Sequence, residues 1–376
     1  MGIGALRRPT LIVVLLLVTL SILWRESSQE ARLRPDGGPC VPRRCCIATS
    51  SYSSRPAVGT RSRKRMLVAI AAFHVPARES FLFRVIETYA AYSTVSVDLI
   101  IDTNAAELRD VLTRRFHGVR MSVNVLGVED MRRFRDADLE AEDRNADAQR
   151  LGTDFWDLTR AHRHHFRARQ EEFDFFLYTE DDVAVSEDGF HFFLERYQPL
   201  WKNNWMFGFF RTELSSSGAL QLPDHMRGDR IVDAPVFVAD DGHWYVQPKN
   251  AYCAFWLVDR EQLREFVEEP SGRYLGGEEG WDTRAKLAFG WQNGRVAGPV
   301  SFWPWQRRRD TWIPRVVHPI DQTGRLDLRA AVQHMPNNYA NHSSFGAAMT
   351  DLFAWNGGPA NALVPLPNHR THPCPQ

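Results

Sequence analysis

The sequence has no excess of charge of either sign, because 46 Lys and Arg side chains balance 46 Asp and Glu side chains. It also has no basic stripe with interleaved aromatic residues, so its charge pattern does not indicate a nucleic-acid partner. Glycine-rich phosphate motifs are missing too, since neither Gly-x-Gly-x-x-Gly nor Gly-x-x-x-x-Gly-Lys-Ser/Thr occurs. A nucleotide bound by this chain would therefore depend on a metal ion rather than on a glycine cradle.

A cleavage site is absent from the N-terminal region. Residues 9–24 form an apolar run that follows Arg7 and Arg8, and no small-x-small site comes after it. As a helix this run would extend about 24 Å, enough for a thin early-secretory bilayer. The pattern favours an uncleaved signal anchor over a cleaved signal peptide. The positive flank predicts a cytosolic tail at 1–8 and a lumenal remainder, as in a single-pass type II membrane protein.

Residues 25–63 are rich in Ser, Arg, Pro and Gly without periodicity, which is typical of an extended stem. The folded domain is expected over 64–376.

Cysteine is scarce in the sequence. The odd count of five cysteines leaves at least one thiol free or paired between chains in an oxidising lumen. Two of them lie in the folded part, Cys253 and Cys374. The stem cysteines could link a homodimer: Cys40, Cys45 and Cys46.

Alternating apolar segments predict an α/β fold. Strand-like runs and helix-like amphipathic runs follow one another in the first part of the expected domain. This order is typical of a parallel sheet with crossover helices. The predicted strands are 66–72, 97–101 and 120–126, and the predicted helices are 78–92 and 106–116.

The most informative stretch runs from Phe173 into three consecutive acids. Residues 173–178 are aromatic, apolar except for Asp174, and too short for a helix, so they predict a strand buried on both faces. Glu180, Asp181 and Asp182 follow it directly. Ligands in open α/β sheets lie at the carboxyl ends of strands, and clustered carboxylates there favour a divalent cation with a diphosphate. An acidic turn or helix N-cap is the alternative.

The segment before this strand is basic. We expect a helix that Asp154 caps, with residues 155, 158, 162 and 166 on one face. His162 and His165 resemble a metal cluster, but without a carboxylate or cysteine between them an exposed basic helix is the preferred interpretation. Arg160 and Arg163 could still reach a phosphate from this helix. Residues 129–150, rich in both charges, are expected to form a solvated loop or exposed helix.

The second half predicts shorter elements. Strands are expected over 205–210 and 250–258, a helix over 260–268, and irregular acceptor-side loops over 220–241. Residues 275–282 place paired acids between glycines ahead of a helix, which would expose the carboxylates. A solvated turn is the alternative for that segment.

Taken together, the chain resembles the GT-A fold Golgi type II nucleotide-sugar glycosyltransferases over residues 65–335. The resemblance rests on the predicted anchor and stem, on the predicted Rossmann-like half-sheet, and on an Asp-x-Asp-type motif, here Glu180-Asp181-Asp182. In addition, Gly276-Gly277-Glu278-Glu279 is similar to the Gly-Gly-Glu-Asp motif of beta-1,4-galactosyltransferases and polypeptide N-acetylgalactosaminyltransferases. Two positions depart from these motifs, Glu180 and Glu279, where Asp is usual.

The resemblance implies a mostly parallel mixed sheet flanked by helices and a Mn²⁺ or Mg²⁺ ion that binds the diphosphate of a nucleotide sugar. Asp182 would be the direct metal ligand, with Glu180 or Asp181 on metal-bound water or the donor ribose. A late histidine would complete the site, and His334 is preferred over His318 because an aromatic and amide-rich segment follows it.

The remaining implied roles concern the acceptor and the nucleoside. Glu278 or Glu279, with Asp282 as third choice, would take the acceptor proton in an inverting transfer, or orient the acceptor in a retaining one. Three residues just beyond the first two strands would lie near the uridine or guanosine: His74, Asp102 and Asn104.

The predicted function is transfer of a sugar to a glycan or glycoprotein, with inversion, in the Golgi or endoplasmic reticulum lumen. Two alternatives stay open. One is a catalytically inactive Golgi protein that keeps the fold and binds a sugar or a partner. The other is a lumenal metal-dependent hydrolase, which usually needs more His and Asp ligands than one acidic cluster.

Overall fold

The computed structural model describes residues 63–138, 155–203, 205–226, 236–246, 253–268, 316–322, 324–340, 345–348 and 363–365. The chain divides into two units, Met1–Thr60 and Arg61–Gln376, and all described residues belong to the second. The predicted tail, anchor and stem cysteines lie outside the described residues, as do Asp154, Cys374 and the segment 275–282. Within the described ranges, no helix is long and apolar enough to cross a membrane.

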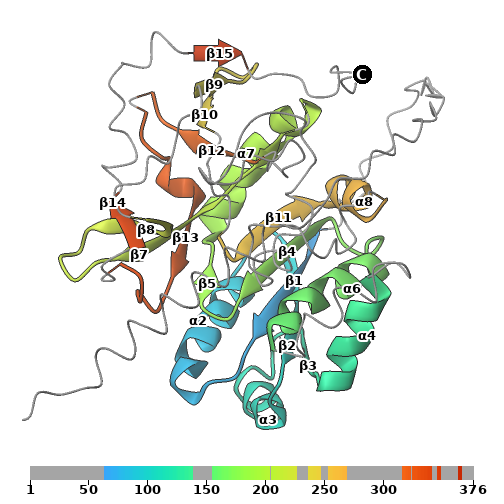
Figure 1. The fold of residues 1–376 in the computed structure, drawn as a ribbon. Helices are drawn as coiled ribbons and strands as arrows, with labels where there is room; N and C mark the ends of the chain where they lie inside the picture. Colours follow the sequence, from blue (N-terminus) through green and yellow to red (C-terminus); the bar gives the residue numbers. More distant parts are fainter. Residues whose placement is uncertain are drawn as a thin grey trace, which may run out of the picture. The chain divides into compact units, whose positions relative to one another are not determined.

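The central sheet is mixed and mostly parallel, as predicted (Figure 1). Its strand order is β11-β4-β1-β2-β3, in which β1 to β4 run parallel and β11 is antiparallel to β4. The strands form because each is a short run of β-branched, aromatic and aliphatic residues bounded by polar turns. Their bounds are β1 Arg65–Ala72, β2 Ser96–Thr103, β3 Met121–Val125, β4 Phe175–Glu180 and β11 Phe255–Asp259.

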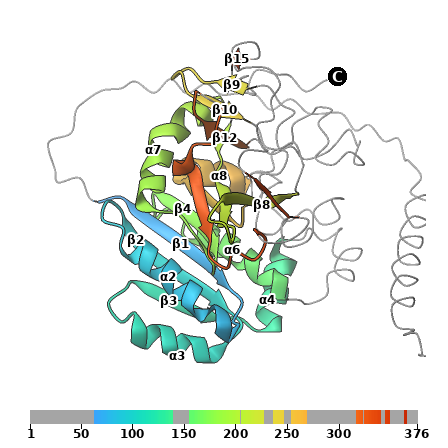
Figure 2. The same ribbon diagram turned by 90° about the vertical axis from the view of Figure 1, so that its left-hand side faces the viewer.

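Helices cover both faces of this sheet, because alternate residues of β1 point to opposite sides. Met66, Val68 and Ile70 join one buried cluster with α2, α3 and α7, and Leu67 and Ala69 join another with α6 and α8. In Figure 2, α2 and α3 lie along one side of β1 and β2. The helices are α2 Glu79–Ala90, α3 Ala106–Arg115, α4 Val128–Asp138, α6 Ala161–Ala168, α7 Glu187–Lys202 and α8 Arg260–Glu268.

Two smaller sheets are built from the residues that follow β4. One has the order β15-β9-β10-β12-β6, with β6 Met206–Phe207, β9 Val236–Val238, β10 Trp244–Val246, β12 Val316–Ile320 and β15 Leu363–Pro365. The other has the order β14-β8-β7-β13-β5, with β5 Val183–Ala184, β7 Phe210–Leu214, β8 Leu220–Met226, β13 Ala331–His334 and β14 Phe345–Ala348. Short 3₁₀ turns complete the fold, at η1 Pro76–Arg78, η2 Phe155–Arg160 and η5 Leu328–Ala330.

Three predictions of local structure are wrong in detail. The single strand expected over 205–210 is two strands, because Gly208 lets its backbone lie against Val316 and His318. The irregular segment expected over 220–241 contains β8 and β9. Strand β8 accommodates Pro223 because the register of its pairing with β14 shifts opposite that residue. The helix expected after Asp154 starts with the 3₁₀ turn η2 before α6.

Candidate functional site

The strand order reverses direction between β1 and β4. The chain moves outward from β1 to β2 and β3, then returns to place β4 on the other side of β1. Such a reversal of strand order is a switch point, and open α/β sheets bind ligands there, at the carboxyl ends of the strands. Asp181 N donates a hydrogen bond to Ala71 O at 3.1 Å, which fixes the acidic triplet beside the end of β1. The predicted strand-end location of the acids is the observed one.

The acidic triplet forms a tight turn between β4 and β5. Thr179 Oγ1 donates to Val183 O at 2.7 Å and closes this turn. Asp181 and Asp182 are 5% and 3% exposed. Burial, followed by the charge of Asp182, raises the pKa of Asp181 well above its usual range. Two buried acids in adjacent positions thus repel each other and need a compensating cation.

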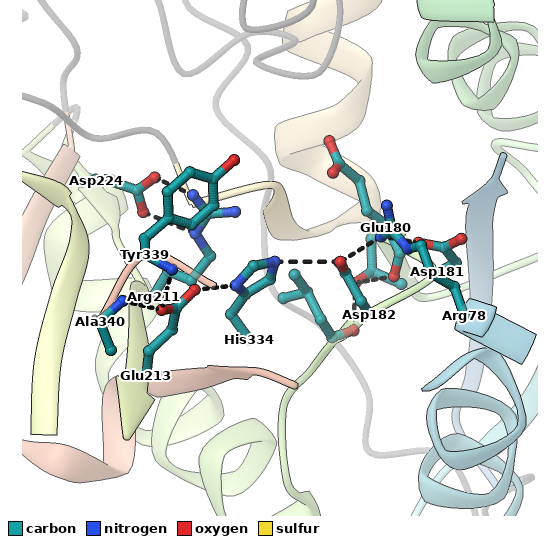
Figure 3. A network of polar contacts seen from close by, with 12 residues as sticks. Arg78, Glu180, Asp181, Asp182, Arg211, Glu213, Asp224, His334, Tyr339 and Ala340 are labelled. Atoms are coloured by element: carbon teal, nitrogen blue, oxygen red, sulfur yellow. Dashed lines mark hydrogen bonds and ion pairs between the residues drawn. The ribbon is translucent and has the colours of Figure 1, made fainter. Parts of the chain in front are cut away.

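Arg78 supplies a positive charge to both acids. This residue ends η1, the turn that links β1 to α2, and its Nη2 donates to Asp181 Oδ1 at 2.6 Å and also to Asp182 Oδ2. Figure 3 shows the guanidinium facing the two carboxylates from the side of β1. Burial alone would raise the pKa of Asp182, but the hydrogen bond from His334 and the nearby positive charges outweigh burial and lower it.

His334 reaches the same carboxylate from a different sheet. Strand β13 pairs with β5 in a register that sets His334 opposite Val183, and Met335 N donates to Asp182 O at 2.9 Å. His334 Nε2 lies 3.1 Å from Asp182 Oδ2. Burial opposes a charge on this imidazole, but the hydrogen bonds to Asp182 and Glu213 outweigh it and raise the pKa of His334. Two residues predicted as metal ligands, Asp182 and His334, are therefore in direct contact.

Glu213 holds the other side of the imidazole (Figure 3). Its carboxylate is 1% exposed at the end of β7, and Oε1 hydrogen-bonds His334 Nδ1. Oε2 accepts from Tyr339 N at 2.8 Å and from Ala340 N at 2.5 Å. The Tyr339 ring stacks on the His334 ring, with 5.8 Å between centroids. One carboxylate thus fixes both the orientation of His334 and the turn that follows it.

A second ion pair lies beside Glu213. Arg211 Nε donates to Asp224 Oδ2 at 3.0 Å, and Nη2 bonds the other oxygen of the same carboxylate. The Arg211 guanidinium lies over the Tyr339 ring at 5.6 Å from its centroid. Burial raises the pKa of Asp224 despite the charge of Arg211. The Arg211–Asp224 ion pair therefore packs beside Tyr339, whose backbone N–H bonds Glu213.

The residues in place fit a divalent cation. Asp182 Oδ1 is buried and accepts no hydrogen bond from any described residue, so a strong acceptor is left over. A carboxylate at Nδ1 orients the imidazole as it does in metal-binding histidines, and it leaves His334 Nε2 on the side of Asp182. Among the described residues, no group of three or more His, Cys, Asp or Glu side chains is arranged to hold a metal. A pair of protein ligands suffices for Mn²⁺ or Mg²⁺ when phosphates and waters provide the rest.

The residues expected near the nucleoside form a separate polar group. His74 N donates to Asn104 Oδ1 at 2.9 Å, and His74 Nε2 lies 2.8 Å from Glu79 Oε1. Asp102 is buried, and both its oxygens lie 3.0 Å from His165 Nε2. His74 and Asn104 follow β1 and β2, and Asp102 lies near the carboxyl end of β2, at the same edge of the sheet as the acidic triplet.

The basic helix differs from its prediction. His162, Arg160 and Arg163 are buried rather than exposed. The His162 ring lies 4.1 Å from the Tyr178 ring and edge-on to Trp256 at 5.3 Å. Burial, followed by the charge of Arg163, lowers the pKa of His162 well below its usual value. Apolar and aromatic packing against the sheet overrides the polar character of this segment.

His318 lies in a different environment from His334. It belongs to β12, in the sheet that β13 does not join, and its Nδ1 lies 3.1 Å from Gly208 O. Burial lowers its pKa to about 4. The structure thus brings His334, and not His318, to the acidic turn. The three predicted acceptor acids, Glu278, Glu279 and Asp282, lie outside the described residues.

Sequence reasoning did not find Arg78 or Glu213 as site residues. Arg78 follows Pro76 and Ala77 in the turn after β1, and no motif marks it. Glu213 lies just beyond the strand predicted over 205–210, so its location near a strand end was available as a signal. Only the pairing of β7 with β13 brings it to His334.

No known protein family matches the sequence, and no curated protein matches it. Among solved structures, the chain is similar to the crystal structure of mouse xyloside xylosyltransferase 1 in its apo form. The TM-score is 0.33, the sequence identity is 13%, and the alignment covers 55% of this chain and 72% of the mouse chain.

Proposed function

We propose that this protein is a metal-dependent glycosyltransferase that moves a sugar from a nucleotide sugar to a glycan or glycoprotein, with inversion. We further propose a type II Golgi membrane protein with a lumenal catalytic domain, which its stem cysteines join into a homodimer. The observation that carries the proposal is the contact between Asp182 and His334 at the switch point, with Glu213 behind the imidazole. The Asp-x-Asp-type motif in the sequence supports it.

The roles of the described residues follow from their contacts. Asp182 and His334 would hold Mn²⁺ or Mg²⁺, and Glu180 or Asp181 would contact metal-bound water or the donor ribose. When bound, such an ion neutralises the diphosphate that leaves with the nucleotide. Glu213 orients the imidazole, and the buried surroundings strengthen each charge interaction at the site. Glu278 or Glu279, or else Asp282, would accept the proton of the attacking hydroxyl.

The test is thermal unfolding of the full chain with a panel of nucleotide sugars, with and without Mn²⁺. A ligand that binds only the native state at about 100 times its Kd adds roughly 2.7 kcal/mol to the free energy of unfolding. We expect one nucleotide sugar to raise the Tm only with Mn²⁺. The shift should vanish in Asp182→Asn, because the metal loses a charged ligand.

The matched control is Asp110→Asn, the same change at an exposed position of α3, which should keep the shift. No shift with any nucleotide sugar in either condition would contradict the proposal and favour the inactive binding protein. Metal-dependent cleavage of a phosphodiester without a sugar acceptor would favour the hydrolase.

A further inference from the structure

We propose that Arg78 is an internal counter-ion that a divalent cation displaces from Asp181 and Asp182, and that the released guanidinium then binds the diphosphate of the donor. The proposal rests on the function proposed above, since it assumes a metal ion and a diphosphate at this site. It adds a specificity-determining residue that the sequence motifs do not indicate.

The first step is that Arg78 occupies the approach to the carboxylates. Its Nη2 is shared between Asp181 Oδ1 and Asp182 Oδ2, the second of which also faces His334 Nε2. The remaining oxygen, Asp182 Oδ1, is buried and has no hydrogen-bond donor in the part of the chain that the structure describes. A cation drawn to that oxygen would meet the guanidinium beside the same carboxylate.

The second step is that the two cations cannot share the site. Like charges held a few ångströms apart in a buried setting repel strongly. A divalent ion offers the acidic turn twice the charge of Arg78 and also satisfies Asp182 Oδ1. The more highly charged cation therefore stays at the carboxylates, and Arg78 must move away from them.

The third step is that the Arg78 side chain can leave the carboxylates and reach the diphosphate of the donor. The Arg78 side chain is 36% exposed, whereas the side chains of Asp181 and Asp182, taken without their backbone, are 8% and 4% exposed. It belongs to the short turn η1, which follows β1 at the switch point where open α/β sheets bind ligands. Its Nε is buried without a hydrogen-bond acceptor among the described residues. A planar guanidinium with donors to spare suits two phosphate oxygens at once.

The experiment titrates Mn²⁺ alone into the full chain and follows the free Mn²⁺ signal by electron paramagnetic resonance. We expect Arg78→Gln to lower the Kd for Mn²⁺ at least tenfold, because the competing charge is gone. Arg78→Lys keeps the charge and should stay within threefold of the wild type. Arg84→Gln removes the same charge from an exposed position of α2 and should also stay within threefold.

A second titration adds inorganic pyrophosphate to each protein saturated with Mn²⁺. The ranking of the variants by affinity should now be the reverse of that for Mn²⁺. Arg78→Gln should bind pyrophosphate at least fivefold more weakly than the wild type and Arg84→Gln. Circular dichroism and the Tm confirm that each variant is folded. Both titrations are independent of catalytic turnover.

The outcomes separate this inference from the proposed function. Equal Mn²⁺ affinity in the wild type and Arg78→Gln, or an equal gain in Arg84→Gln, would overturn the displacement of Arg78 while the metal site stands. Unchanged pyrophosphate affinity in Arg78→Gln would overturn its role toward the diphosphate. Failure of both the wild type and Arg78→Gln to bind Mn²⁺ would overturn the metal site itself and the function built on it.

Discussion

Replacing Glu213 by glutamine tests how the imidazole of His334 is set. The change keeps the size of the side chain but turns one carboxylate oxygen into an amide group. The amide oxygen can still accept from Tyr339 N and Ala340 N, which now bond Oε2. The amide nitrogen then faces His334 Nδ1 and can only donate, so the ring proton must move to Nε2. Nε2 is the atom that faces Asp182, and a protonated Nε2 cannot bind a metal.

The size of the effect follows from these contacts. Loss of the carboxylate behind a metal-binding histidine typically weakens metal binding 10- to 100-fold, and we expect that range for Glu213→Gln. Stability should change little in this variant, because the two backbone donors keep their acceptor. Glu213→Ala instead removes the acceptor of His334 Nδ1, of the buried Ala340 N–H and of the partly buried Tyr339 N–H. At about 1–3 kcal/mol for each unpaired group, it should lose about 3 kcal/mol or more.

Two measurements check this pair of variants. Calorimetric titration with Mn²⁺ gives the metal affinity, and urea unfolding followed by tryptophan fluorescence gives the free energy of unfolding. Glu87→Gln is the matched control, since Glu87 is exposed and its ion pair with Arg115 lies at the surface. If Glu213→Gln bound Mn²⁺ with wild-type affinity, the shift of the His334 ring proton to Nε2 would be refuted. A loss below 1 kcal/mol in Glu213→Ala would refute the contacts assigned to the carboxylate.

Three further predictions concern stability. Gly208→Ala should lose about 1–3 kcal/mol in urea unfolding, because the new Cβ would lie 2.1 Å from Val316 Cγ1, whereas Gly118→Ala meets nothing within 4 Å and should be neutral. Ser186→Ala should lose about 1 kcal/mol, because Ser186 Oγ caps α7 by accepting from Gly189 N at 3.1 Å; retention of wild-type stability would contradict this cap. His318, with its pKa lowered to about 4 from 6.5, stabilises the fold above pH 6.5. That contribution, up to about 3 kcal/mol, is lost as the pH falls from 6.5 to 4. The free energy of unfolding of the wild type should exceed that of His318→Gln by less and less as the pH falls across that range. A difference that stays constant would contradict this prediction.

The first half of the fold could be predicted because its central strands β1 and β4 are buried on both faces. Runs such as 66–72 and 173–178 are apolar or aromatic except for Asp174, too short for helices, and separated by amphipathic segments. That pattern has few solutions other than a parallel sheet with crossover helices. The small sheets of the second half gave a weaker signal. Strands of two or three residues, such as β5 and β6, carry too little periodicity to be recognised.

The candidate site was predictable only in part, because its members come from distant parts of the chain. Asp182 and His334 are separated by 152 positions and meet through the pairing of β5 with β13. Sequence could name both residues as candidates but could not exclude His318, since both histidines are buried and only the strand pairing sets His334 beside Asp182. Arg160 and Arg163 show the opposite failure. Their charge predicted exposure, whereas the aromatic residues beside them pack the whole segment against the sheet.

The acidic turn is fixed from two directions, and this bears on how the site works. Asp181 N is bonded to Ala71 O in the central sheet, and Asp182 O accepts from Met335 N beside the sheet that contains β13. Adjacent residues are thus tied to two different sheets, so the fold and not a ligand sets the separation of the carboxylates. Their repulsion costs stability, which the surrounding packing must offset. A site that keeps two acids together at such a cost is suited to bind a cation strongly, because the carboxylates themselves need not move when the cation arrives.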